Sequence, residues 1–299
     1  MNRRNFVQNS IASIAIGSMN LEKNPAKTNL KAIGLATNWG WTGTLEAFAI
    51  KIKALAYDGF ETWFPTEKKQ QDELFEILKK YKLEVGFLVG GAGPDFNIHF
   101  NTFKKSLQEA LNFAQKPLYV NCHSGKDYFS FEQNSKFIEL TIEQSEKTSI
   151  RIAHETHRGR MCFAAHVTRQ FLEKYPKMRL TLDISHWTNV HESLLADQTD
   201  AVNLALSRTI HLHTRVGHEE GPQVNDPRAP EWSQTLNQHL KWWDAVVENL
   251  AKNGEKQFTF LTEFGPPSYL PTLPYSNMPV ADQWDINVHM LNLIKNRYA

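Results

Sequence analysis

Residues 151–187, RIAHETHRGRMCFAAHVTRQFLEKYPKMRLTLDISHW, contain two strand-like runs with a helix-like run between them. The runs RIAHET (151–156) and MRLTLD (178–183) are short and rich in apolar or β-branched residues, and HVTRQFLEKYP (166–176) has the pattern of a helix. A strand, a helix and a second strand in this order form a unit whose two strands are parallel. We therefore expect a parallel sheet around this stretch.

The same unit repeats along the chain from Leu30 onward. The other strand-like runs are KAIGLAT (31–37), FETWFP (60–65), EVGFLVGG (84–91), PLYVNCH (117–123), TIHLHTRV (209–216) and QFTFLTEF (257–264). A helix-like segment follows each strand; Gly59 is expected to end the first helix, and the last helix lies near residues 285–298. Eight strands and eight helices in strict alternation over about 270 residues predict the α/β class and a single (β/α)8 TIM barrel at residues 29–299. An open doubly wound sheet is the alternative, but ATNWGWTG after the first strand lacks the GxGxxG loop typical of that fold.

The first 28 residues carry a different signal. MNRRNFVQNSIASIAIGSM has Arg3 and Arg4, a Phe two positions on, and a short apolar stretch from Ile11 to Met19. This pattern resembles a twin-arginine export signal. We expect residues 1–28 to be an export signal and linker, and the protein to be periplasmic or otherwise exported. The alternative is the frayed N-terminus of a cytoplasmic enzyme.

Composition narrows the possible partners. The chain has 33 Lys and Arg against 32 Asp and Glu, a net charge of +1, so it offers no broad basic surface for nucleic acid. We expect no nucleic-acid partner and no membrane span, because no apolar run is long enough to cross a bilayer. Cys122 and Cys162 are too few for a disulfide framework, and we expect two buried residues. A homo-oligomer is compatible with this composition.

The last four strands each end in a residue type that binds metals: Glu155, Asp183, His213 and Glu263. In a barrel of this type the carboxyl ends of the strands meet at one face. His211 and His213 point the same way because alternate residues of a strand share a face, and His213 lies nearer the end. Three buried carboxylates would repel one another without a cation. We therefore expect one divalent ion, Mn²⁺, Mg²⁺, Co²⁺ or Zn²⁺. Taken singly, each residue has a plainer interpretation, a solvated loop carboxylate or a packed histidine.

The order Glu, Asp-x-x-His, His, Glu resembles that of the xylose isomerase-like TIM barrels. That superfamily includes sugar isomerases, ketose 3-epimerases, inosose dehydratases and endonucleases of the endonuclease IV type. AYDGFETW (56–63), which contains Glu61, resembles the second-strand motif of the same group. The resemblance implies that Glu155, Asp183, His213 and Glu263 hold the metal. It also implies that Glu155 and Glu263 act as acid and base on opposite sides of a sugar, through a metal-stabilised enediolate.

Other residues are candidates for substrate binding. The resemblance implies that His186 bonds a substrate oxygen and that Arg215 neutralises developing charge. His123, His157, Trp39 and Trp63 follow strands and are expected to contact a sugar, as are Trp41 and Trp187; ordinary barrel packing is the alternative for the tryptophans. The insert HEEGPQVNDPRAPEW (218–232) is expected to be a lid, a partner surface or a loop without a role.

Two positions depart from the epimerase pattern. Met161 and Glu219 stand where that branch usually has a Glu and an Arg. We expect a sugar isomerase or epimerase that acts on a sugar or keto-sugar. The alternatives are a metal-dependent lyase or hydrolase on keto-sugars or glycosides, a barrel that only binds a sugar, and a DNA repair endonuclease. The endonuclease is disfavoured because the third strand ends LVGG without a His, and the seventh loop offers Asp226-x-Arg228.

Overall fold

The apolar runs of the sequence form a closed barrel of eight parallel strands, in a computed structural model that describes residues 29–298. The strands are β1 (Lys31–Thr37), β2 (Gly59–Trp63), β3 (Glu84–Gly90), β4 (Val120–His123), β5 (Ile152–Glu155), β6 (Leu180–Leu182), β7 (Thr209–His213) and β8 (Gln257–Thr262). Each strand pairs with the next, and β8 closes the ring by pairing with β1. The predicted single (β/α)8 barrel is confirmed. The expected export segment, residues 1–28, lies outside the described residues.

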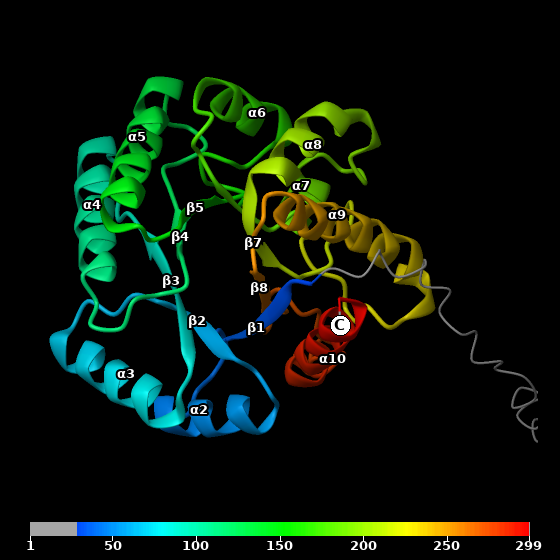
Figure 1. Cartoon of the computed structure of the whole chain (residues 1–299). Helices are drawn as coiled ribbons and strands as arrows, with labels where there is room; N and C mark the ends of the chain where they lie inside the picture. Colours follow the sequence, from blue (N-terminus) through cyan, green and yellow to red (C-terminus); the bar gives the residue numbers. More distant parts are fainter. Residues whose placement is uncertain (1–28, 299) are drawn as a thin grey trace, which may run out of the picture.

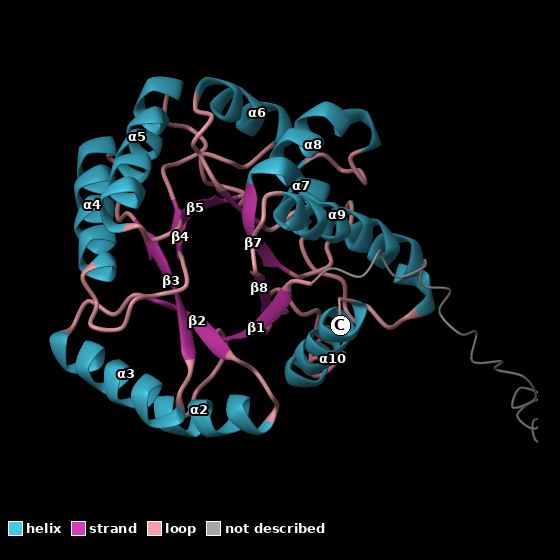
Figure 2. Ribbon diagram, viewed as in Figure 1, coloured by secondary structure: helices cyan, strands magenta, loops and turns pink. Residues whose placement is uncertain are grey.

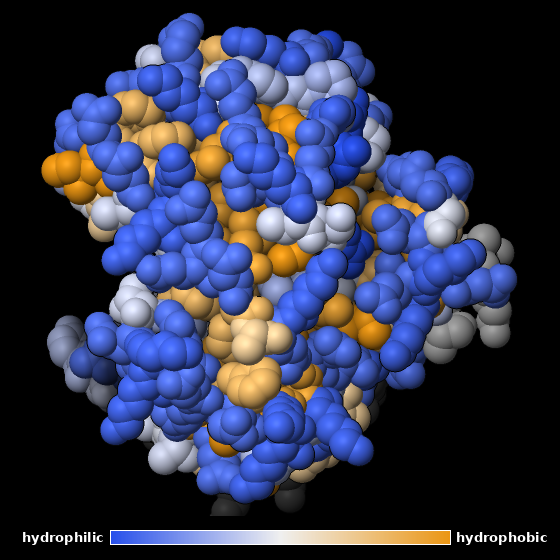
Figure 3. Space-filling view, turned by 60° about the vertical axis from the view of Figure 1, so that its left-hand side comes forward, coloured by the Kyte–Doolittle hydropathy of each residue, from blue (hydrophilic) through white to orange (hydrophobic). Residues whose placement is uncertain are grey.

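Helices surround the strands as an outer ring (Figures 1 and 2). They are α2 (Leu45–Ala54), α3 (Lys68–Tyr81), α4 (Phe96–Leu111), α5 (Phe131–Thr148), α6 (Ala165–Lys174), α7 (Ser185–Val190), α8 (Thr199–Arg208), α9 (Ser233–Lys252) and α10 (Gln283–Arg297), with short 3-10 turns η1 (Ala196–Gln198) and η2 (Pro230–Trp232). Apolar side chains between the two rings form the main core, in which many of the largest fully buried residues are phenylalanines. The face of the molecule shown in Figure 3 is largely hydrophilic, and hydrophobic side chains gather in a band across its middle.

The expected strict alternation is wrong after β6, because two helices follow that strand. The extra helix α7 begins directly behind Asp183, whose carboxylate accepts hydrogen bonds from the backbone N–H and the hydroxyl of Ser185. A side-chain oxygen that satisfies a free N–H in the first turn favours a helix start. The helix has 6 residues, which is too short to produce a periodic pattern.

Gly59 does not end the first helix as expected; α2 ends at Ala54, and Gly59 is the first residue of β2. A Cβ atom at Gly59 would lie 2.0 Å from the backbone oxygen of Glu84 on the neighbouring strand β3. The glycine therefore serves strand packing, where only a residue without a side chain fits.

The inside of the barrel is layered along its axis. A small apolar cluster of Ile33, Leu35, Tyr119 and Leu261 lies apart from the main core. The His211 ring stacks on Tyr119 with 3.9 Å between the ring centres. Since alternate residues on a strand share a face, His213 and Glu263 stand one step nearer the carboxyl end than His211 and Leu261. This apolar layer is the floor beneath the polar residues.

Among residues 29–298, no helix is long and apolar enough to cross a bilayer. Cys122 and Cys162 are free and buried, as the sequence predicts.

Candidate active site

The carboxyl ends of β5 to β8 bring the four predicted ligands together. Glu155 ends β5, Asp183 follows β6, His213 ends β7, and Glu263 follows β8. Ligand-type atoms of Asp183, His213 and Glu263 lie within 4.8 Å of one another, and so do those of Glu155, Asp183 and His186. Residues that are far apart in the sequence therefore form one polar cluster above the apolar floor.

His213 is the centre of this cluster. Its Nδ1 lies 2.9 Å from Glu263 Oε2 and 3.8 Å from Glu155 Oε1, and its Nε2 lies 3.5 Å from Glu61 Oε1. Burial alone would lower the pKa of His213, but the carboxylates of Glu263, Glu155 and Glu61 raise this pKa well above its ordinary value. In this state the imidazolium compensates part of the surrounding negative charge.

Arg215 supplies the second buried positive charge. Its Nη2 donates a hydrogen bond to Asp183 Oδ2, and it lies 2.9 Å from His186 Nε2 and 3.5 Å from Glu263 Oε2. Burial raises the pKa of Asp183 to about 7, although the Arg215 charge acts to lower it. The guanidinium nitrogen therefore stands among residues that were expected to surround a cation.

The donor set fits a divalent cation. Glu155 Oε1 and Glu61 Oε2 are buried and have no hydrogen-bond partner within residues 29–298. Unpartnered buried carboxylate oxygens are costly, and a bound cation removes that cost. Glu155, Asp183, His213 and Glu263 would hold such an ion, with His213 neutral when it acts as a ligand. The metal itself remains a prediction.

Glu155 lies behind the wall of the site. Its Oε2 accepts a hydrogen bond from the Asn121 amide at 2.6 Å and lies 2.9 Å from His123 Nε2. Burial acts to raise the pKa of Glu155, but His123 and His213 together hold this pKa well below its ordinary value. Glu155 is thus a fixed carboxylate that orients His123. Asn121 gave no signal in the sequence, because an isolated Asn within a strand is not a recognisable motif.

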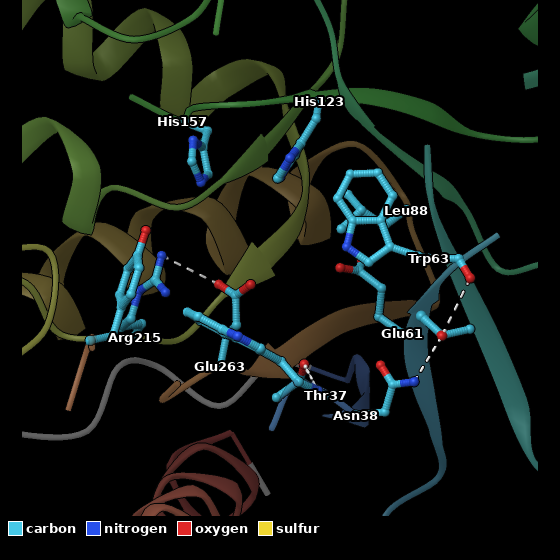
Figure 4. Close-up of a pocket in the computed structure, with 12 residues that line it drawn as sticks. Thr37, Asn38, Glu61, Trp63, Leu88, His123, His157, Arg215 and Glu263 are labelled. Atoms are coloured by element: carbon cyan, nitrogen blue, oxygen red, sulfur yellow. Dashed lines mark hydrogen bonds and ion pairs between the residues drawn. The ribbon is translucent and has the colours of Figure 1, made fainter. Parts of the chain in front are cut away.

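A cavity of about 340 Å³ opens above the cluster, a size suited to a small ligand (Figure 4). Of the residues predicted from the sequence, it is lined by Glu263, Arg215, His123, His157, Trp39 and Trp63. Glu61 also reaches it, although the sequence marked Glu61 only as part of a motif. Glu61 and Glu263 both point into the space below His123 and His157 (Figure 4).

His186 does not reach the cavity, contrary to its expected contact with a substrate oxygen. It is fully buried, and the His157 ring packs against it with 3.9 Å between the ring centres. His157 Nδ1 lies 2.6 Å from the carbonyl oxygen of Arg158 and donates to it, which leaves Nε2 as an acceptor. Burial, with the nearby His123 charge, lowers the pKa of His157 to about 3, so the ring is neutral at pH 7.

The aromatic wall differs in part from the expectation. Trp187 is fully buried, and its indole N–H donates to the Cys162 carbonyl oxygen, so packing is the correct interpretation for it. Trp41 packs on Phe48 and is absent from the cavity wall. Tyr269, which the sequence did not indicate, lines the cavity instead. The Arg215 guanidinium carbon lies over its ring, 5.0 Å from the ring centre.

The insert at 218–232 folds back onto the neighbouring loops. Gln223 is buried and exchanges two hydrogen bonds with the backbone of Gly265, just after β8. Arg228 pairs with Asp226 and with Asp285 of α10. These contacts fix the insert beside the end of β8, and none of its residues lines the cavity.

Comparison with solved structures identifies the fold. A 3-keto-D-glucoside 4-epimerase from E. coli superposes with a TM-score of 0.55 at 14% identity, covering 89% of this chain and 100% of that one. An AP endonuclease of family 2 from Brucella melitensis gives 0.54 at 13% identity, covering 79% and 93%. A xylose isomerase-like TIM barrel protein from Mycobacterium smegmatis, in complex with magnesium, gives 0.53 at 9% identity, covering 89% and 97%.

The chain shares the TIM barrel fold of these structures, one of which is a xylose isomerase-like protein. The resemblance seen in the sequence is confirmed at this level. No protein-family model and no curated protein matches the chain.

Proposed function

We propose that this protein is a metal-dependent isomerase or epimerase of a sugar or keto-sugar. One observation carries the proposal: a buried cluster of three carboxylates and an imidazole forms the base of a cavity with aromatic walls, and one of those carboxylates, Glu263, faces the cavity. Polar groups convergent on a single apolar-walled pocket are typical of an active site. The aromatic rings of Trp39, Trp63 and Tyr269 suit the apolar faces of a sugar ring.

A divalent cation, when held by Glu155, Asp183, His213 and Glu263, supplies a positive charge that stabilises an oxyanion on the substrate. A cation would complete the cluster, because buried carboxylate oxygens of Glu155 and Glu61 accept no hydrogen bond within residues 29–298. Magnesium in the Mycobacterium smegmatis relative supports this part of the proposal.

Glu263 is the proposed base. Burial acts to raise its pKa, but the charges of His213 and Arg215 lower this pKa below its ordinary value, so the carboxylate is ionised at neutral pH. It takes the proton from the carbon next to the substrate carbonyl. The C–H electron pair becomes the C=C bond of an enediolate, and the carbonyl oxygen gains a negative charge. Arg215, at the same wall, stabilises that charge.

Glu155 is the proposed second proton carrier. Its Oε1 accepts no hydrogen bond within the described residues, and its Oε2 holds His123 at the wall of the cavity. A proton from solvent, passed through His123 on the Glu155 side, adds to carbon, and Glu263 releases the proton that it took, so both residues return to their starting states. Addition to the same carbon from this side inverts its configuration. Addition to the neighbouring carbon, with transfer of a hydroxyl proton between the two enediolate oxygens, moves the carbonyl. The epimerase of keto-glucosides among the similar structures supports chemistry of this class.

The test is hydrogen exchange. The purified protein, loaded in turn with Mn²⁺, Mg²⁺, Co²⁺ or Zn²⁺, is incubated in D₂O with a panel of ketoses and keto-glycosides. We expect deuterium to appear at the carbon next to the carbonyl without bond cleavage. Glu263→Gln should abolish the exchange, and Glu143→Gln, which alters an exposed pair with Lys147 on α5 outside the cavity wall, should retain it. Release of a sugar would instead support the lyase or hydrolase alternative, and cleavage of abasic DNA without exchange would overturn the proposal.

A further inference from the structure

A second hollow adjoins the proposed active site. It has a volume of about 480 Å³, larger than the 340 Å³ of the active-site cavity, and it lies over the ends of β1 and β2. Asn38, Thr62 and Trp63 line both hollows. The two hollows therefore adjoin along a shared wall, and we call the second hollow the groove.

The three shared residues form a connected partition. The Asn38 amide donates to the Thr62 hydroxyl at 3.0 Å, and this hydroxyl donates to the Trp63 carbonyl oxygen at 3.4 Å (Figure 4). The Trp63 ring meets the His123 ring edge to face, with 5.2 Å between the centres. Gly90, at the end of β3, leaves room for the indole, because a Cβ atom there would lie 3.2 Å from it.

Trp63 is held on one side and open on the other. Its exposed fraction is 52%, which is high for a residue whose ring is fixed against His123. A rigid, exposed indole between two hollows is a stacking surface for a ring that lies in the groove. Trp63 therefore presents contact area to ligand atoms beyond those that the reaction requires.

The groove has its own apolar and polar parts. Leu45, Pro65 and Leu74 give it an apolar side. Gln70 and Glu73 lie on its rim, three residues apart on α3 and hence on one face of that helix. Both are exposed, and neither makes a side-chain hydrogen bond or ion pair within the part of the chain that the structure describes. They are available to bind hydroxyl groups.

The charge of the groove disfavours an anionic occupant. Among the described residues that line it are the carboxylate of Glu73 and no lysine or arginine. Phosphate and carboxylate groups are bound by cationic side chains or by free backbone N–H groups. A neutral ring with apolar faces and hydroxyl edges matches the aromatic surface, the apolar side and the amide and carboxylate rim.

We propose that the substrate is a glycoside of at least two sugar units, with the reacting keto-sugar in the cavity and the second sugar in the groove, stacked on Trp63. This inference rests on the proposed function and specifies its substrate class. The groove residues Gln70 and Glu73 then determine specificity and take no part in proton transfer.

The experiment compares matched substrate pairs: fructose with maltulose, and 3-ketoglucose with 3-ketotrehalose. For each pair we measure kcat/KM for deuterium exchange and divide the value for the disaccharide by the value for the monosaccharide. One aromatic stacking contact and its buried area favour the disaccharide by about tenfold in the wild type. Gln70→Trp fills the groove with a large side chain and should lower the ratio by about fivefold or more. Glu76→Trp, an exposed position on α3 outside the groove, is the matched control and should leave the ratio unchanged.

The outcomes separate the two proposals. Exchange with a wild-type ratio near one, or a ratio that Gln70→Trp does not lower, overturns the role of the groove and leaves the proposed reaction intact. Exchange with neither member of any pair overturns the proposed function together with this inference. Thermal unfolding of Gln70→Trp and Glu76→Trp at the wild-type temperature establishes that both variants are folded.

Discussion

The guanidinium of Arg215 donates a hydrogen bond to the carboxylate of Asp183 inside the barrel, where both side chains are almost completely buried. The same nitrogen lies near His186 and Glu263. A fixed positive charge thus occupies part of the space between residues proposed as metal ligands. A divalent cation held by the proposed ligands would therefore compete with Arg215 for the Asp183 carboxylate.

Arg215→Met should therefore bind Mn²⁺ more tightly than the wild type. Removing a like charge close to the ion is worth about 1.4 kcal/mol or more, which is about tenfold in the dissociation constant. Without metal the variant should be less stable by about 3 kcal/mol, because Asp183 stays buried without its partner. Isothermal titration and urea unfolding measure the two effects. Arg158→Met removes a guanidinium that contacts Tyr269 and Asn189, and it serves as the control. Weaker Mn²⁺ binding by Arg215→Met would contradict the competition.

Metal content tests the ligand set directly. Asp183→Asn and Glu263→Gln each replace a buried anionic oxygen by a neutral one, and such ligands bind a hard divalent cation much more weakly. We expect each variant to lose bound metal after purification by at least about tenfold, measured by elemental analysis. Asp226→Asn, a change in the Arg228 pair of the insert, should keep the wild-type content. Full occupancy in both ligand variants would refute the site.

The sequence predicts the positions at the ends of β5 to β8 well, because each ligand directly follows a short apolar run. It cannot predict which side chain a ligand contacts, since that depends on how strands and loops from different parts of the chain meet when the barrel closes. Asn121 holds Glu155, Tyr269 lies under Arg215, and Glu61 reaches His213, yet none of these pairs is close in sequence. The sequence predicts that His186 contacts the substrate, but the His157 ring covers it, and that contact is a tertiary feature with no signal in the sequence.

The apolar floor is closely packed at Gly86 of β3. A Cβ atom there would lie 2.4 Å from the Tyr119 ring, which is fully buried and stacked on His211. Gly86→Ala should destabilise the protein by about 1–3 kcal/mol, because the fixed ring has no room to move. Urea unfolding measures the loss. In the Tyr119→Leu variant the side chain that faces Gly86 is smaller. Adding Gly86→Ala to that variant should therefore lower the free energy of unfolding by less than half as much as in the wild type. Equal costs in both backgrounds would show that Tyr119 is not what the methyl group meets.

His239 makes the stability of the barrel depend on pH. The residue is fully buried on α9, donates from Nδ1 to the Thr235 carbonyl oxygen, and accepts at Nε2 from the Gly217 N–H. Burial lowers the pKa of His239 to about 4 from its ordinary 6.5, although the bond to Thr235 acts in the opposite direction. Between these two values the unfolded chain binds a proton and the folded protein does not. The free energy of unfolding therefore rises with pH through this window and falls as the solution is acidified.

His239→Gln removes this titration while keeping a side-chain acceptor within reach of Gly217. From about pH 5 to about pH 7 the wild-type gain in unfolding free energy should exceed that of the variant by about 2 kcal/mol, measured by urea unfolding at each pH. Other buried histidines, such as His154 with a pKa of about 3, contribute in the same direction. Only the difference between the two proteins isolates His239. Parallel pH profiles for both would mean that His239 is accessible to protons in the folded state.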